Sequence, residues 1–283
     1  MLAETTEQLG DANEARWLCE HASGLDGDEF RQSQDEFVTT AMAKQLHDMV
    51  RRRLDGEPLQ YVMKRWAFRH LDVLVDQRVL IPRPETELLV EVGLAIANER
   101  LKQVDRPLNI VDLGTGSGVI GLSMAHELPL GRTNVWLTDQ SSDALDVARG
   151  NLVGVGQKGG GVRLALGSWW NALDGSLKGA IDIALCNPPY IAHDDDEVAT
   201  DVHKWEPHSA LYAGDNGLAD IREVISGATT WLANNGWLAL EIGYRQGDEA
   251  RALLENAGLV HAEIRRDLAG RDRIALAQRQ TAS

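Results

Sequence analysis

The stretch that decides the fold is residues 108–118, which read Leu-Asn-Ile-Val-Asp-Leu-Gly-Thr-Gly-Ser-Gly. Its first six residues are mostly apolar and predict a buried strand, Leu108–Leu113. The glycines that follow permit a tight turn and let a ligand approach the backbone, and the next helix begins there with unpaired N–H groups. We therefore expect a ligand-binding loop at the carboxyl end of this strand.

The acid inside this strand indicates what kind of ligand the loop binds. A G-x-G-x-x-G string occurs at Gly116, Gly118 and Gly121, but it starts too late for a dinucleotide loop because the strand already ends at Gly114. Pyrophosphate at the helix N-terminus would gain nothing from Asp112 beside it. A ligand that carries an ammonium or sulfonium cation would be stabilised there.

From residue 108 onward, strand-like and helix-like segments alternate. Such alternation predicts an α/β fold, with a parallel sheet covered by helices on both faces and ligands at the carboxyl ends of the strands. The further strands are expected at Asn134–Thr138, Val162–Leu166, Ile181–Cys186, Gly236–Ile242, Val260–Ile264 and Ile274–Ala277. The helices are expected at Val119–Glu127, Ser142–Leu152, Leu218–Leu232 and Gln246–Ala257.

Two strand ends carry side chains suited to a nucleoside. Asp139 ends the second strand, where an acid can accept hydrogen bonds from both hydroxyls of a ribose, although an N-cap of the next helix is an equal alternative. The third strand leads into Ser168-Trp169-Trp170, where a tryptophan either stacks on an adenine or fills the core.

The fourth strand ends in Cys186-Asn187-Pro188-Pro189-Tyr190. The two prolines stiffen this strand end, Asn187 offers an amide that accepts and donates, and Tyr190 offers an aromatic face. Together they fit either chemistry on a planar nitrogen, in a base or an amide, or a proline turn that leaves the sheet.

The chain before residue 83 has a different pattern. Residues 1–64 predict a small helical bundle, with helices at Ala12–Ala22 and Asp35–Leu54 and a break at Gly24–Gly27. Residues 65–82 predict a hairpin whose turn is Asp76-Gln77. Pro84 is expected to start the next helix, and Arg83 either clamps this loop or borders a site.

The overall composition limits the possible partners. The net charge of −15 disfavours DNA as the main substrate, and the polar, acidic start and the lack of long apolar runs predict neither a membrane span nor a secretory signal. Cys19 and Cys186 indicate reduced thiols in the cytoplasm. We expect no metal, since the candidate ligands near His193, Asp194–Glu197 and His203 lack a fixed spacing.

Taken together, these features resemble the class I S-adenosylmethionine-dependent methyltransferases, and specifically the release factor glutamine methyltransferase family (PrmC/HemK). The motifs that carry the resemblance are Gly56–Tyr61, Leu80–Glu87, Asp112–Gly118, Asn187–Ile191, Trp205-Glu206-Pro207 and Glu241-Ile242-Gly243, with Asp267, Gly270 and Arg273 near the end. The chain departs from the family at Lys64, where a glycine is usual, at Ser168, where an acid is usual, and in a short segment before Ala12.

The resemblance implies a helical domain at 1–64 that recognises the release factor, a hairpin linker at 65–82 and a Rossmann-like methyltransferase domain at 83–283 with a seven-stranded, mostly parallel sheet. It implies methylation of the glutamine in the Gly-Gly-Gln loop of class I peptide chain release factors, on the side-chain nitrogen, which modulates translation termination. S-adenosylmethionine is the implied cofactor, and a cytoplasmic monomer without stable nucleic acid is expected.

The resemblance also assigns residues to roles. The implied cofactor residues are Asp112, Gly114, Thr115, Gly116, Ser117, Gly118, Asp139, Trp169 and Asn187. The implied catalytic residues are Asn187, Pro188 and Tyr190, and the implied substrate residues are these three with Pro189 and Arg83. A DNA adenine methyltransferase and a non-catalytic cofactor-binding scaffold are the alternatives.

Overall fold

A computed structural model describes residues 1–25, 27–33, 35–192 and 200–280, without the side chains of 200–202. The chain forms two compact units, Met1–Trp66 with Ala199–Trp205, and Ala67–Val198 with Glu206–Ser283. The acidic segment Asp194–Glu197 and His193 lie outside the described residues. Among the described residues, no helix is long and apolar enough to cross a membrane.

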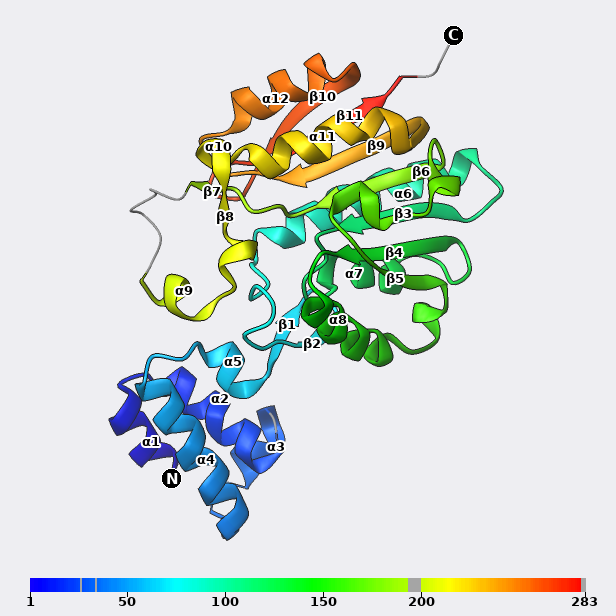
Figure 1. The fold of residues 1–283 in the computed structure, drawn as a ribbon. Coiled ribbons are helices and arrows are strands. Elements are labelled where there is room, and N and C mark those ends of the chain that lie inside the picture. Colours follow the sequence, from blue (N-terminus) through cyan, green and yellow to red (C-terminus); the bar gives the residue numbers. More distant parts are fainter. Residues whose placement is uncertain (26, 34, 193–199, 281–283) are drawn as a thin grey trace. The chain divides into compact units, whose positions relative to one another are not determined.

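The first unit is helical. Its helices are α1 (Leu2–Leu9), α2 (Ala12–Ser23), α3 (Gly27–Gln32), α4 (Thr40–Leu54), α5 (Leu59–Met63) and α9 (Thr200–Trp205). Buried residues of α2, α4 and α5 form a small core that includes Leu18, Leu46 and Val50. The helical bundle predicted for this region is therefore present (Figure 1).

Three details of the predicted bundle were wrong. Helix α4 begins at Thr40 and not at Asp35, because Thr39 Oγ1 accepts a hydrogen bond from the Met42 N–H at 3.2 Å and caps the helix there. Phe37, which falls inside the predicted helix Asp35–Leu54, precedes α4 and is fully exposed. Helices α1 and α3 were not predicted, but the predicted break at Gly24–Gly27 does separate α2, which ends at Ser23, from α3, which begins at Gly27.

The predicted hairpin forms, but its turn lies earlier in the chain. Strands β1 (Arg65–Phe68) and β2 (Leu71–Leu74) pair around Arg69-His70, so the turn expected at Asp76-Gln77 was wrong. Arg69 adopts φ 50°, its N–H donates to Glu87 Oε1 at 3.1 Å, and its Nε donates to Glu127 Oε1 at 2.7 Å. These hydrogen bonds hold Arg69 in a conformation that its own side chain disfavours.

Seven of the described strands form the central sheet of the second unit, in the order β10-β11-β9-β6-β3-β4-β5. Strand β11 runs antiparallel to both of its neighbours, β9 and β10, and the other six strands of the sheet all run in one direction. The predicted α/β fold with a seven-stranded, mostly parallel sheet is confirmed (Figure 1). The strands are β3 (Leu108–Leu113), β4 (Thr133–Asp139), β5 (Val162–Leu166), β6 (Ile181–Cys186), β9 (Leu232–Glu241), β10 (Leu259–Arg266) and β11 (Asp272–Arg279).

Helices pack on both faces of this sheet. Three helices pack against β3, β4, β5 and β6, and α7 contacts the other two. They are α6 (Thr86–Gln103), α7 (Val119–Glu127) and α8 (Ser142–Val155). Over β9, β10 and β11 lie α11 (Ala219–Trp231) and α12 (Gly247–Asn256). The shorter elements are η1 (Gly156–Gly161), η2 (Trp169–Ala172), η3 (Gly175–Leu177), β7 (Ile191–Ala192), η4 (His208–Ala210), β8 (Tyr212–Ala213) and α10 (Gly214–Gly217).

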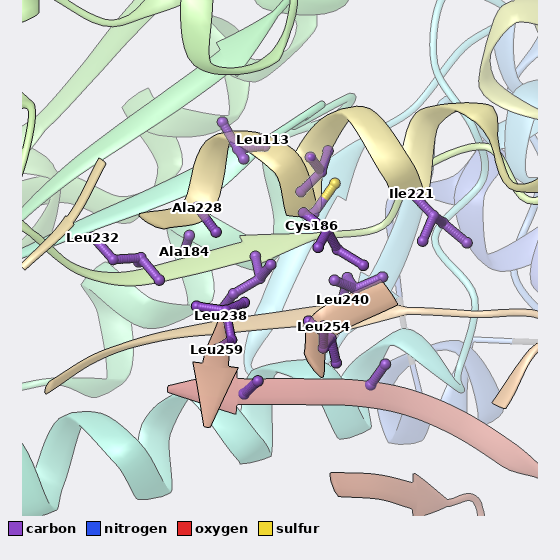
Figure 2. Close-up of a cluster of buried hydrophobic side chains, with 14 of the residues drawn as sticks. Leu113, Ala184, Cys186, Ile221, Ala228, Leu232, Leu238, Leu240, Leu254 and Leu259 are labelled. Atoms are coloured by element: carbon purple, nitrogen blue, oxygen red, sulfur yellow. The ribbon is translucent and has the colours of Figure 1, made fainter. Parts of the chain in front are cut away.

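Alternate residues of the central strands build the core beneath α11. Figure 2 shows Leu113, Ala184, Cys186, Leu238 and Leu240 gathered with residues of α11. Because side chains alternate across a strand, the residues between them face the opposite layer, where Leu185 meets α6 at Gly93. A sheet packed on both faces is rigid, and it fixes where each strand end places its functional side chain.

Candidate active site

The glycine loop after β3 is shaped by left-handed backbone and by one buried acid. Gly114, Gly116 and Gly118 have φ values of 70°, 54° and 89°, which side chains disfavour. Asp112 Oδ2 accepts hydrogen bonds from Thr115 Oγ1 and, at 2.9 Å, from the Gly121 N–H. The loop is therefore tied to the strand below it by Asp112.

Asp112 is fully buried beneath the loop, and burial raises the pKa of its carboxyl to about 6. Its Oδ1 has no hydrogen-bond partner among the described residues. A negative charge held at this depth is well placed to interact with a positively charged ligand above the loop.

Asp139 ends β4 beside the same loop. Its Oδ2 accepts from the Gly116 N–H and its Oδ1 from the Ser141 N–H, both at 2.9 Å, and burial raises its pKa. Helix α8 is capped by Ser141, whose Oγ accepts from the Ala144 N–H at 3.2 Å. Asp139 is therefore not the N-cap, and each of its carboxylate oxygens retains a second lone pair.

The two tryptophans after β5 have different environments. Trp169 has φ 45°, and its ring lies so close to Gly114 that a Cβ there would be 3.0 Å away. The Asp220 carboxylate accepts a hydrogen bond from the Trp169 side chain. Trp170 is buried, donates to the Val224 carbonyl at 2.8 Å and stacks on Trp231. Trp169 therefore belongs to the site and Trp170 to the core.

Asn187 follows β6 and is held by a chain of hydrogen bonds. Its Nδ2 donates to Thr86 Oγ1 at 3.2 Å, and Thr86 Oγ1 donates to Glu241 Oε2 at 2.7 Å. The Tyr190 hydroxyl donates to the other oxygen, Glu241 Oε1, at 3.1 Å. Burial raises the pKa of both Tyr190 and Glu241. The first residue of α6 and the last residue of β9 thus fix the position of two predicted catalytic residues.

Sequence reasoning assigned no role to Thr86 or Glu241. Both occur in motifs that carried the family resemblance, Pro-Glu-Thr-Glu and Glu-Ile-Gly. They are 155 positions apart, so only the folded chain brings them together.

Arg83 is fixed by an acid that the sequence also left without a role. Its guanidinium forms an ion pair with Glu206, whose other oxygen accepts from the Ile81 N–H at 3.0 Å. Glu206 is only 4% exposed, so its carboxylate is well shielded from solvent. The segment from Ile81 to Arg83 is thereby fastened to the segment that begins at Glu206.

These groups surround one cavity of about 490 Å³ in the second unit. The predicted site residues that line it are Arg83, Gly114, Thr115, Gly116, Ser117, Asp139, Trp169, Asn187 and Pro189. Asp112, Gly118, Pro188 and Tyr190 lie outside its lining. The cavity has the size of a small-molecule site, and its lining combines carboxylate, amide and aromatic groups.

The part of the chain that the structure describes contains no cluster suited to a metal. Among those residues, no group of three or more His, Cys, Asp or Glu side chains could hold a metal ion. The sequence candidates His193 and Asp194–Glu197 lie outside this part of the chain.

The chain is similar to two curated relatives over nearly its whole length. It is 39% identical to the release factor glutamine methyltransferase of Burkholderia pseudomallei, over 93% of this chain and 90% of the relative. It is 37% identical to the enzyme of the same name from Xylella fastidiosa, over 98% of this chain and 96% of the relative. The chain belongs to the release factor glutamine methyltransferase family. It is therefore a methyltransferase.

Two family models match different parts of the chain. The model described as the PrmC N-terminal domain matches residues 1–63, and the methyltransferase small domain matches residues 90–205. The fold is also similar to the crystal structure of a methyltransferase from Pyrococcus furiosus, with a TM-score of 0.52 and 15% identity over 84% of this chain and 99% of that one. Membership of the family thus agrees with the fold of the second unit.

Proposed function

We propose that this chain transfers a methyl group from S-adenosylmethionine to the side-chain amide nitrogen of the glutamine in the Gly-Gly-Gln motif of class I peptide chain release factors. The observation that best supports this proposal is the hydrogen bonding of the Asn187 side-chain amide, which lines the cavity. Its Nδ2 is engaged by Thr86, and its Oδ1 has no hydrogen-bond partner among the described residues. An amide oxygen free at this position suits a substrate that brings an N–H2 group.

The residues at the cavity fit S-adenosylmethionine. Gly116 has open space where a Cβ would lie, so a ligand can approach its backbone. The free lone pairs of Asp139 suit two ribose hydroxyls, the Trp169 ring suits an adenine, and the unpartnered Oδ1 of Asp112 supplies negative charge near a cation. When bound, S-adenosylmethionine supplies an electrophilic methyl group and leaves as S-adenosylhomocysteine.

The protein's part in the reaction is to orient a poor nucleophile. An amide nitrogen delocalises its lone pair into the carbonyl. We assign the Asn187 Oδ1 and the Pro188 carbonyl as acceptors for its two N–H bonds, which directs the lone pair toward the donor and favours pyramidalisation. Tyr190, fixed by Glu241, and Pro189 support the amide plane, and Arg83 borders the substrate.

Proximity and orientation account for most of the acceleration in this scheme. Holding the two reactants in a reactive geometry supplies on the order of 7–11 kcal/mol. No base is needed before attack, because the amide proton becomes acidic only as the new N–C bond forms, and it then passes from the methylated nitrogen to solvent.

The division of labour along the chain is part of the same proposal. We assign residues 1–64 to recognition of the release factor, 65–82 to a linker and 83–283 to methyl transfer. The net charge of −15 argues against a stable complex with nucleic acid, and we propose that the enzyme acts as a monomer.

A transfer assay tests the assignment. The protein is incubated with methyl-labelled S-adenosylmethionine and release factor, a Gln→Ala variant of its Gly-Gly-Gln motif, or duplex DNA. Label is expected only on the release factor that retains the Gly-Gly-Gln glutamine. Label on DNA or on the Gln→Ala factor would overturn the proposal, and no label anywhere would favour a cofactor-binding scaffold.

A variant of this chain tests the role of Asn187. Asn187→Ala should abolish turnover but leave S-adenosylmethionine affinity, measured by calorimetry, within about threefold of wild type, because Asn187 is one of many cavity contacts. Turnover at the wild-type rate would remove Asn187 from the mechanism.

A further inference from the structure

Thr86 lies between two groups that organise the candidate site, the half-buried Asn187 and the fully buried Glu241. It is 2% exposed, begins α6 and lines the cavity. Its one hydroxyl contacts both Asn187 Nδ2, at 3.2 Å, and Glu241 Oε2, at 2.7 Å. A hydroxyl has a single proton, so it can donate to only one of these partners.

The chemistry of Glu241 decides which partner receives that proton. An ionised carboxylate only accepts hydrogen bonds, so Thr86 must donate to Glu241 and can only accept from Asn187. Asn187 must therefore turn its Nδ2–H2 toward Thr86 and its Oδ1 away from it. The hydrogen bond to Thr86 thus fixes the orientation of the Asn187 amide, whose oxygen and nitrogen have nearly the same shape.

The surroundings of Glu241 favour its ionised form in part and oppose it in part. Burial and the nearby charge of Glu85 raise its pKa, whereas the hydrogen bonds from Thr86 and Tyr190 and the charge of Arg273 lower it. Each carboxylate oxygen of Glu241 accepts one hydrogen bond from a hydroxyl: Oε2 from Thr86 and Oε1 from Tyr190. Glu241 thus acts as the common acceptor that orients both hydroxyls.

We propose that Thr86 is a positioning residue for methyl transfer. Its hydroxyl donates a hydrogen bond to Glu241 and accepts one from Asn187 Nδ2, and this holds Asn187 with its Oδ1 available to the N–H of the target glutamine. The proposal rests on the proposed role of Asn187 in binding that amide. If the Asn187 amide were turned the other way, its N–H2 would face the N–H2 of the target glutamine. Both groups are donors, so no hydrogen bond could form between them.

Three variants test the inference. Thr86→Val keeps the shape of the side chain but removes the hydroxyl, so kcat should fall roughly 10- to 100-fold, the usual effect of leaving one buried polar group unsatisfied. Thr86→Ser restores a hydroxyl and should recover most of that loss. S-adenosylmethionine affinity should change less than about threefold in both, because Thr86 is one of many cavity contacts.

Glu241→Gln addresses the direction of the hydrogen bonds without changing the size of the side chain. A neutral amide can donate to Thr86, which frees the Thr86 proton for Asn187 Oδ1 and turns the Asn187 amide around. We expect kcat to fall roughly tenfold or more, with melting temperature and cofactor affinity retained. This variant keeps the test decisive if Thr86→Val fails to fold.

The pH dependence of turnover supplies a readout that a purely structural role would not alter. In wild type, protonation of Glu241 reverses its hydrogen bond with Thr86, so kcat should decline on the acid side. Because the pKa of Glu241 is raised, this decline should begin above the ordinary glutamate range. The acid limb should disappear in Glu241→Gln, while Tyr190, Arg273 and Glu85 remain unchanged around it.

Ser123→Ala is the matched control, because it removes another fully buried hydroxyl of the same unit that has no partner among the described residues. It should leave kcat unchanged. Wild-type kcat in Thr86→Val, no rescue by Thr86→Ser, or an unaltered acid limb in Glu241→Gln would each overturn the inference. If Asn187→Ala is inactive while Thr86→Val has the wild-type kcat, the role of Thr86 is wrong but the proposed function stands. If Asn187→Ala is fully active, the proposed function itself is contradicted.

Discussion

At the scale of single residues, the site depends on buried carboxylates that accept hydrogen bonds from other groups of the protein. Asp112 ties the glycine loop to β3, and Glu241 accepts from both Thr86 and Tyr190. Each buried carboxylate lowers the stability of the folded protein in exchange for a fixed charge or a fixed hydrogen-bond direction. Function and stability are therefore expected to oppose one another at these positions.

Asp112→Asn tests this opposition. Burial raises the pKa of Asp112 from its ordinary 3.8 to about 6, so the folded state holds this proton more tightly than the unfolded state does. Stability should then fall as pH rises through this interval and stay level above it. At pH 7 the buried ionised carboxylate costs the wild type about 3 kcal/mol, the free energy of a shift of about two pKa units, so the uncharged variant should be the more stable protein.

Thermal or urea unfolding of the ligand-free protein between pH 4 and pH 8 measures this effect. The variant should also show a flatter pH dependence and weaker S-adenosylmethionine binding. A variant less stable than wild type at pH 7 would mean that the ionised carboxylate contributes more to the loop than its burial costs.

At the scale of elements, apolar patterning predicted the sheet well and the polar hydrogen bonds poorly. Strands β3, β5 and β6 have the predicted bounds because buried parallel strands read as unbroken apolar runs. The start of α4 and the turn of the hairpin depended on the Thr39 cap and on contacts of Arg69 with residues distant in sequence. The Thr86–Glu241 hydrogen bond could not be predicted, since no local pattern relates residues so far apart.

Lys64 illustrates how a departure from the family pattern relates to the backbone. It ends α5 in the left-handed region, with φ 55°, where the family usually has a glycine. Lys64 therefore replaces the usual glycine but still adopts the left-handed backbone conformation that glycine favours.

The contact of α7 with the sheet supplies an element-scale prediction. A Cβ at Gly121 would lie 2.2 Å from Leu137 Cδ2 and 3.1 Å from the Asp112 Cβ, and Leu137 is fully buried. Gly121→Ala should therefore destabilise the protein by about 1–3 kcal/mol through overpacking. Urea unfolding measures the difference.

Gly150→Ala is the matched control, because this glycine lies in α8 and has open space, with nothing within 4 Å, where a Cβ would lie. The same substitution there should stabilise the protein by about 0.5–1 kcal/mol through helix propensity. Equal effects at the two positions would contradict the proposed close contact of α7 with β4.

At the scale of the whole molecule, the chain separates into a helical unit and an α/β unit, each with its own core. The cavity lined by Asn187 lies entirely in the second unit. The first unit carries an apolar hollow of about 310 Å³, lined in part by Val38 and Met42, beside the fully exposed Phe37. Exposed apolar groups around a hollow are typical of a protein-binding surface.

Phe37→Ala tests the proposed recognition role of the helical unit. Loss of an exposed aromatic anchor should raise KM for the release factor roughly fivefold or more, without changing kcat or the Kd for S-adenosylmethionine. Val153→Ala, at an exposed apolar position of α8 in the other unit, is the control and should leave KM unchanged. Equal KM values for all three proteins would argue that Phe37 takes no part in recognition.

The central claim is that this chain methylates one amide nitrogen of a release factor. Tandem mass spectrometry of release factor incubated with the enzyme and S-adenosylmethionine tests it most directly. One added methyl group is expected on the side-chain nitrogen of the Gly-Gly-Gln glutamine, and it should be absent when Asn187→Ala replaces the wild-type enzyme. A methyl group on any other residue, or an unmodified glutamine after incubation with active wild-type enzyme, would contradict it.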